Sequence, residues 1–179
     1  MSEERYLVKK TLRVLYITLL TLLCFGTYIL PRLRSIGRFN AQRIFATIHS
    51  FRFFGLVFLL PGVVGSKLPA GFAVLAAYGD LITGVLALLA LLSVRIRPLF
   101  WFFIVAFNVV GATDLLVAYY HAICFGLPYD AGQLGAAYMI PIFYVPMLMI
   151  THAVALIWLV WPERKAAQTL TGGAASYLG

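Results

Sequence analysis

Long apolar runs separated by short polar loops dominate this chain, and they constrain its fold more than any other feature. A helix needs about 20 mostly apolar residues to cross the hydrocarbon of a bilayer. Five segments meet that requirement, namely residues 12–30, 44–64, 70–94, 99–121 and 138–161. Nothing in the chain shows the alternation over about ten residues that marks a membrane β-barrel strand. We therefore predict an all-α integral membrane bundle of about five transmembrane helices.

The composition excludes most other classes of protein. Hydrophobic residues make up 63% of the chain and charged residues 11%, whereas a soluble domain carries about 25% charged residues. A soluble enzyme this apolar would expose large sticky patches. The net charge of +8 lies in short clusters between apolar runs, which is typical of membrane topology and not of a nucleic-acid-binding surface. The expected partner is the lipid bilayer, with a homo-oligomer or a larger membrane complex as a further alternative. Cys24 and Cys124 form no motif, so buried thiols are expected and a disulfide is not.

Residues 1–165 are predicted to form a single transmembrane domain, and residues 166–179 a loose tail rich in Ala, Gly and Thr. Orientation follows from Lys and Arg in short loops, which stay on the cytoplasmic side. They cluster after the first, third and fifth runs, as Arg32, Arg34, Arg38, Arg43, Arg95, Arg97, Arg164 and Lys165. These places share one side of a five-helix chain. We therefore expect an inner (plasma) membrane protein with its N-terminus outside and its C-terminus in the cytoplasm.

The basic residues before the first run oppose this orientation. They are Arg5, Lys9, Lys10 and Arg13. The first run therefore either crosses the membrane against its own charges, which we prefer, or lies in the interface as an amphipathic anchor.

Polar residues inside the apolar runs are the first candidates for function, because an ionisable group at the centre of a span costs about 2.5–3.5 kcal/mol on insertion scales. The candidates are Arg52, Asp80, Asn108, Asp114 and His152. Asp80 shares a helical face with small residues, so we expect it to face another helix. Arg52 is the expected counter-charge. The pair is either a packing device, a proton or ion relay, or a clamp for an anionic headgroup.

Two further runs carry polar residues in register. Asn108, Gly111 and Asp114 step by three and predict a polar stripe that reaches the outer surface. Asn108 is either a packing hydrogen bond or a ligand contact, and Asp114 either a solvated carboxylate or part of the site. His152 is the candidate that can change charge near neutral pH. We expect it to face the bundle interior within reach of Asn108 or Asp80.

Prolines interrupt the fifth run before His152. Pro141 and Pro146 each remove a backbone donor and free carbonyl groups that can line a cavity.

The stretch between Phe51 and Leu159 contains several short sequence patterns. They are Phe51-Arg52, Leu68-Pro69-x-x-Phe72-Ala73, Gly79-Asp80, Asn108-x-x-Gly111-x-x-Asp114 and Ile140-Pro141-x-Phe143-x-Val145-Pro146 followed by His152. In these patterns the chain resembles an uncharacterised family of bacterial multi-pass membrane proteins. The resemblance implies a membrane-embedded fold, and the family has no assigned activity.

Three functions remain open at this point. The first is a polar site within the membrane that binds or transports a small solute or protons, because polar residues beside a broken helix are typical of transporter sites. The second is an accessory or structural subunit of a larger membrane complex. The third is an intramembrane enzyme or a haem or metal protein. His49 and His152 are the candidate ligands for the haem or metal, and the sequence supports them only weakly. No catalytic motif is present and no cofactor is predicted.

Overall fold

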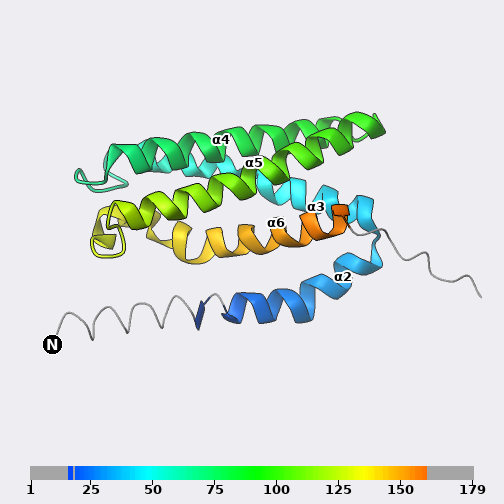
Figure 1. The fold of residues 1–179 in the computed structure, drawn as a ribbon, viewed down its shortest axis with the longest axis horizontal. Coiled ribbons are helices and arrows are strands. Elements are labelled where there is room, and N and C mark those ends of the chain that lie inside the picture. The colour runs from blue at the N-terminus through cyan, green and yellow to red at the C-terminus, as the bar shows by residue number, and fades with distance from the viewer. Residues whose placement is uncertain (1–15, 18, 161–179) are drawn as a thin grey trace, which may run out of the picture.

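The computed structural model describes residues 16–17 and 19–160, and this part of the chain is helical and contains no strand (Figure 1). The labelled elements are the π-helix η1 (Phe25–Ile29), α2 (Leu30–Ser35), α3 (Arg38–Ser50), the 3-10 helix η2 (Phe51–Leu59), α4 (Ala70–Leu92), α5 (Arg97–Cys124), the 3-10 helix η3 (Ala131–Tyr138), the π-helix η4 (Ile140–Tyr144) and α6 (Val145–Val160). The predicted tail at 166–179, Arg164 with Lys165, and the basic residues before residue 16 lie outside the described residues.

Three helices of the described part are long and apolar enough to cross a membrane. They are Ala70–Leu92, Arg97–Cys124 and Ile140–Val160, the last being η4 and α6 together. Their ends lie within three residues of the third, fourth and fifth predicted runs. The structure therefore supports three such helices where the sequence predicted about five. The first predicted run, 12–30, begins outside the described residues.

The second predicted run differs from the structure in both its start and its geometry. Helix α3 begins at Arg38, earlier than residue 44, and the chain leaves α-helical geometry at Phe51 to continue as η2. No single α-helix covers residues 44–64. This run is therefore not among the helices that are both long enough and apolar enough to cross a membrane. A 13-residue α-helix followed by a 9-residue 3-10 helix nevertheless extends about 37 Å.

Two apolar clusters pack against different parts of α4. One contains Phe45 of α3 and Phe100 of α5 and packs on Ala87 and Ala90. The other contains Phe58 of η2 and packs on α4 at Phe72, Ala73 and Ala76. Small side chains along α4 let the neighbouring helices approach closely. The part of α4 that carries Asp80 and Thr83 lies between these clusters, and both side chains are buried.

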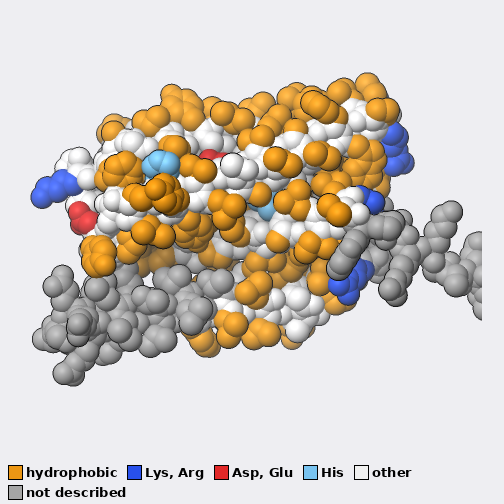
Figure 2. All heavy atoms as spheres, in the orientation of Figure 1, with side chains coloured by type: hydrophobic (Ala, Val, Ile, Leu, Met, Phe, Trp, Pro, Cys, Tyr) orange, Lys and Arg blue, Asp and Glu red, His pale blue; other side chains and the backbone are white. Residues whose placement is uncertain are grey.

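The surface of the molecule is apolar along its flank, and most of its visible basic side chains lie at one end, while the other end shows an acidic side chain beside a basic one (Figure 2). Figure 2 shows hydrophobic side chains over most of the visible flank, with Lys and Arg side chains towards the two ends of the long axis. The Arg97 guanidinium lies 3.9 Å from the ring centroid of Phe39, so two of the predicted basic clusters meet at one end. Cys24 and Cys124 are free, as predicted, but both are exposed. The expectation of buried thiols was wrong because both residues lie on outward faces of their helices.

Candidate functional site

Arg52, at the start of η2, is fully buried and forms the centre of a polar cluster between the two apolar clusters. Its Nε donates to Asp80 Oδ1 over 2.6 Å, and its Nη2 lies 2.5 Å from the same oxygen. Nη2 also donates to Asp114 Oδ2 over 2.6 Å. Nη1 donates to the Gly111 carbonyl oxygen over 3.3 Å and faces His152 Nε2 at 3.4 Å. A guanidinium has five N–H donors, and all five of them point at protein acceptors.

Two carboxylates therefore share one guanidinium. With all three groups ionised the cluster carries a net charge of −1. Asp80 Oδ2 and Asp114 Oδ1 have no hydrogen-bond partner among the described residues. The Asp80 and Asp114 side chains are only 10% and 9% exposed. Burying an uncompensated charge is costly, so two buried carboxylates on one guanidinium favour taking up one proton or one further cation.

Glycines make the room for this cluster. A Cβ built on Gly55 would overlap the Asp80 carboxylate, and one built on Gly79 would overlap that of Asp114. A Cβ on Gly111 would lie 2.6 Å from His152 Nε2. These three positions let the charged side chains lie directly against neighbouring backbones, because no side chain separates them.

His152 links the cluster to α5. Its Nδ1 lies 3.0 Å from Asn108 Oδ1, and Asn108 Nδ2 donates to the Ile104 carbonyl oxygen over 2.8 Å. Since Asn108 Oδ1 only accepts and Arg52 Nη1 only donates, the contacts assign the proton to Nδ1 and leave Nε2 as an acceptor. In this arrangement His152 is a neutral imidazole that both orients Asn108 and accepts from Arg52.

A second histidine lies directly against His152. The ring centroids of His49 and His152 are 4.0 Å apart with an interplanar angle of 37°. His49 Nε2 lies 2.9 Å from Thr151 Oγ1, while the buried His49 Nδ1 has no partner among the described residues. With centroids only 4.0 Å apart the two rings leave no space for a porphyrin between them, so the pair does not fit a bis-histidine haem. The described residues contain no group of three or more His, Cys, Asp or Glu side chains that could hold a metal ion.

A polar stripe on α3 and the start of η2 extends the cluster towards the basic end. It consists of Arg38, Gln42, His49 and Arg52, at spacings of four, seven and three. Gln42 is fully buried and donates from Nε2 to the Ala155 carbonyl oxygen over 3.0 Å, while its Oε1 has no partner among the described residues. The sequence analysis missed Gln42 because it started this run at residue 44. The heptad-like spacing to His49 was the available signal.

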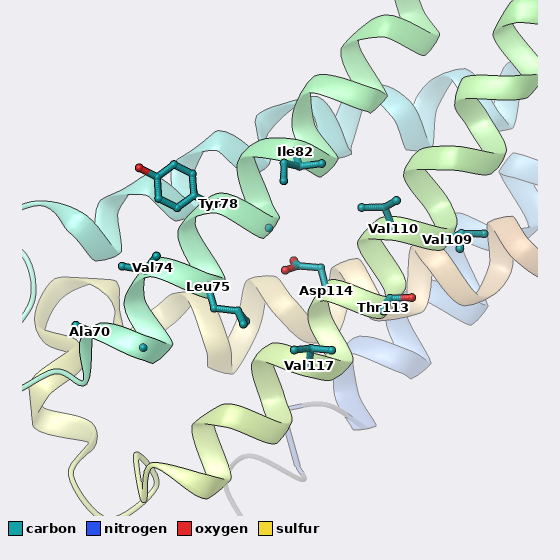
Figure 3. Close-up of a pocket in the computed structure, with 12 residues that line it drawn as sticks. Ala70, Val74, Leu75, Tyr78, Ile82, Val109, Val110, Thr113, Asp114 and Val117 are labelled. Atoms are coloured by element: carbon teal, nitrogen blue, oxygen red, sulfur yellow. The ribbon is translucent and has the colours of Figure 1, made fainter.

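Two hollows adjoin the carboxylates. A small cavity of about 60 Å³ is lined by Asp80, Asp114 and Tyr119 together with apolar side chains. Tyr119 Oη donates to the Pro141 carbonyl oxygen over 3.3 Å, so a proline in the fifth run does expose a carbonyl to a partner. A larger groove of about 930 Å³ runs between α4 and α5. Figure 3 shows the Asp114 carboxylate pointing from α5 into the space towards α4.

The five candidate residues named from the sequence are brought together in this one cluster. Arg52 lies against Asp80, as expected, and His152 faces Asn108. Asp114 is paired with Arg52 through Oδ2, so it is part of the cluster. The polar stripe of α5 ends in the cluster because Gly79 lets Asp114 reach Arg52.

Comparison with known families places the chain. A family model described as a domain of unknown function, DUF8737, matches residues 10–160. The chain belongs to the DUF8737 family. No curated protein and no solved structure matches it. Every candidate residue of this DUF8737 chain lies inside the matched region, and the resemblance to an uncharacterised family is confirmed at that level.

Proposed function

We propose that this DUF8737 protein is a multi-pass protein of the bacterial inner membrane whose central cluster binds and transfers protons. The observation that carries the proposal is that two buried carboxylates, Asp80 and Asp114, share the single guanidinium of Arg52. One added proton on Asp80 or Asp114 makes the cluster neutral, and both carboxylates keep one oxygen without a partner among the described residues.

The proposed membrane arrangement uses five crossing segments. Helices α4, α5 and η4–α6 meet the length and hydropathy that a span requires. The α3–η2 segment extends about 37 Å by its helical rises, more than the about 30 Å of hydrocarbon. Residues 12–30 supply the fifth. The end at which Arg97 meets Phe39 then faces the cytoplasm, with the N-terminus outside and the C-terminus inside.

The hydrogen bonds favour a proton over an anion or a metal ion. All five Arg52 donors point at protein acceptors, so none is left to hold an anionic headgroup or a free phosphate. A metal cation needs several oxygen ligands, whereas Asp80 and Asp114 offer one free oxygen each. A proton needs a single acceptor.

Groups able to exchange a proton lie on both sides of Arg52. The cavity of about 60 Å³ beside the carboxylates has room for about two water molecules. On the other side the His49 and His152 rings are in contact, and Gln42 is buried on the same helix as His49. The buried His49 Nδ1 and Gln42 Oε1 are atoms that ordered water commonly satisfies. These features support a proton path that passes Arg52 without crossing lipid.

Proton flux into proteoliposomes tests the proposal directly. The purified protein is reconstituted with a pH-sensitive dye inside the vesicles, and a potassium diffusion potential set by valinomycin drives protons inward. We expect acidification faster than in protein-free vesicles. Asp114→Asn is expected to reduce it to the protein-free rate, because the remaining Arg52–Asp80 pair is already neutral and no longer takes up a proton.

Asp130→Asn is the matched control, since this exposed carboxylate lies outside the cluster. Its flux is expected to equal that of the unmodified protein. Flux equal to that of protein-free vesicles for the unmodified protein would overturn the proposal and leave the cluster as a packing device of a membrane subunit.

A further inference from the structure

The groove between α4 and α5 has apolar walls but is lined by a carboxylate. It measures about 930 Å³, within the range of about 300–1,000 Å³ for small-molecule sites. Its walls are apolar or hydroxyl-bearing, as Val74 and Tyr78 on α4 and Thr113 on α5 illustrate. Asp114 is the one carboxylate that lines it. Gly71 and Gly79 of α4 also line it.

The Asp114 carboxylate faces two environments at once. Its Oδ2 accepts from Arg52, whereas its Oδ1 lies over Gly79 with no partner among the described residues. Gly79 itself lines the groove, so the free oxygen lies where a molecule in the groove can reach it. A bilayer acyl chain fills such a groove but offers nothing to this oxygen.

A carboxylate oxygen in an apolar groove is complementary to a cation with an apolar chain. We propose that the α4–α5 groove binds a membrane-soluble amine, with its apolar chain along the groove and its protonated amino group on Asp114 Oδ1. The ammonium supplies the positive charge that the cluster of Arg52, Asp80 and Asp114 lacks. It also supplies hydrogen-bond donors in a place that water reaches poorly.

A second copy of the chain fits the groove less well. Between Ala70 and Leu92 there is no Lys or Arg, and α5 and α6 carry none after Arg97. Arg52 itself is fully buried. A second copy therefore has no cation to present at this depth from α4, α5 or α6, whereas a small lipophilic amine carries its own.

This inference shares Asp114 with the proton site but does not need conduction. When proton uptake and amine binding use the same carboxylate they compete for it. A protonated amine that enters from the bilayer would then displace the proton that the cluster otherwise takes up.

Binding to the protein in nanodiscs of zwitterionic phosphatidylcholine tests the groove. The probe is an undecylamine that carries the dansyl label at the end of the chain opposite its free amino group, and its matched control has a hydroxyl group in place of that amino group. Fluorescence titration against protein-free nanodiscs measures saturable binding. We expect saturable binding of the amine, at least about tenfold tighter than that of the alcohol, which corresponds to about 1.4 kcal/mol. Asp114→Asn is expected to abolish the difference between amine and alcohol.

A matched pair of variants keeps the test independent of Asp114. Val74 and Val85 are both on α4 and are 46% and 47% exposed, but only Val74 lines the groove. Val74→Trp fills the groove and is expected to weaken amine binding by about tenfold or more, whereas Val85→Trp leaves it unchanged.

Three outcomes would overturn the inference. They are equal binding of amine and alcohol, unchanged amine binding in Val74→Trp, and a dimer of the unmodified protein that Val74→Trp converts to monomer. Proton flux without amine binding would reject the groove as an amine site and leave the proton proposal standing.

Discussion

At the scale of single residues, Arg52 joins η2 to three other helices. It contacts α4 through Asp80 and α5 through Asp114 and Gly111, and it faces α6 through His152. Removing one member of a buried charge pair is far more harmful than replacing the whole pair, because the remaining charge stays buried without compensation.

Arg52→Leu is therefore expected to be the most damaging single change in the cluster. Losing a partner from a buried ion pair costs about 3–5 kcal/mol, and here two carboxylates lose their counter-charge. Thermal unfolding in detergent measures the effect. Adding Asp80→Asn to Arg52→Leu is expected to recover part of the lost stability, since one of the two unpaired charges is removed. A double variant no more stable than the single one would show that charge compensation is not the role of Arg52.

Gly79→Ala tests the close approach of Asp114 to α4. The new methyl group would overlap the carboxylate, so the ion pair with Arg52 must shift. Overpacking of this kind costs about 1–3 kcal/mol. Gly26→Ala is the control, because a Cβ there has no heavy atom within 4 Å. The same thermal measurement is expected to show Gly26→Ala unchanged or slightly stabilised. Equal melting temperatures for the two variants would contradict the close approach.

At the scale of elements, α3 and the start of η2 carry the polar stripe and pack against three apolar helices. Long apolar helices were predictable from the sequence because hydropathy over a 20-residue window depends little on tertiary contacts. The switch from α-helix to 3-10 helix at Phe51 was not, because neither a proline nor a capping pattern marks it. Gln42 was missed for a related reason. It lies in the arginine-rich segment before the predicted run. In such a polar segment, the residues that face the protein interior can be identified only once the helix and its rotation are known.

Gln42→Leu separates a role in proton transfer from a role in packing. The amide makes one hydrogen bond, to Ala155, and its Oε1 has no partner among the described residues. Leucine removes one hydrogen bond worth about 0.5–1.5 kcal/mol and adds apolar contact, so stability is expected to change little. Proton flux is expected to fall, since the leucine offers no group to the stripe. The comparison variant is Thr47→Leu on the exposed face of α3, for which flux stays at the level of the unmodified protein. Equal flux in both would remove Gln42 from the path.

At the scale of the whole molecule, the polar cluster lies between two apolar clusters and the basic residues gather towards the ends. Asp80, Asn108, Asp114 and His152 could be picked out from sequence because each is costly in hydrocarbon unless it meets a partner. Which partner each one meets depends on how the helices rotate against one another. The sharing of Arg52 by two carboxylates follows from that rotation, and no spacing along the chain reveals it.

The proposed topology makes one prediction that needs no purified protein. Reporter fusions inserted at Gly132 and placed after Lys165 are expected to lie on opposite sides of the membrane, external and cytoplasmic respectively. The reason is that η4–α6, which is long and apolar enough to cross a membrane, lies between them, and basic residues stay on the cytoplasmic side. Two fusions active on the same side would contradict the arrangement.

The order in which the cluster residues are synthesised has a consequence for how the protein is made. Arg52 precedes Asp80 by 28 residues and Asp114 by 62, so it leaves the ribosome before either of its counter-charges exists. A lone arginine at the centre of a span costs about 2.5–3.5 kcal/mol during insertion. In the five-segment arrangement that we propose, the α3–η2 segment is therefore expected to remain at the translocon until α4 and α5 have emerged, and to enter the lipid together with them.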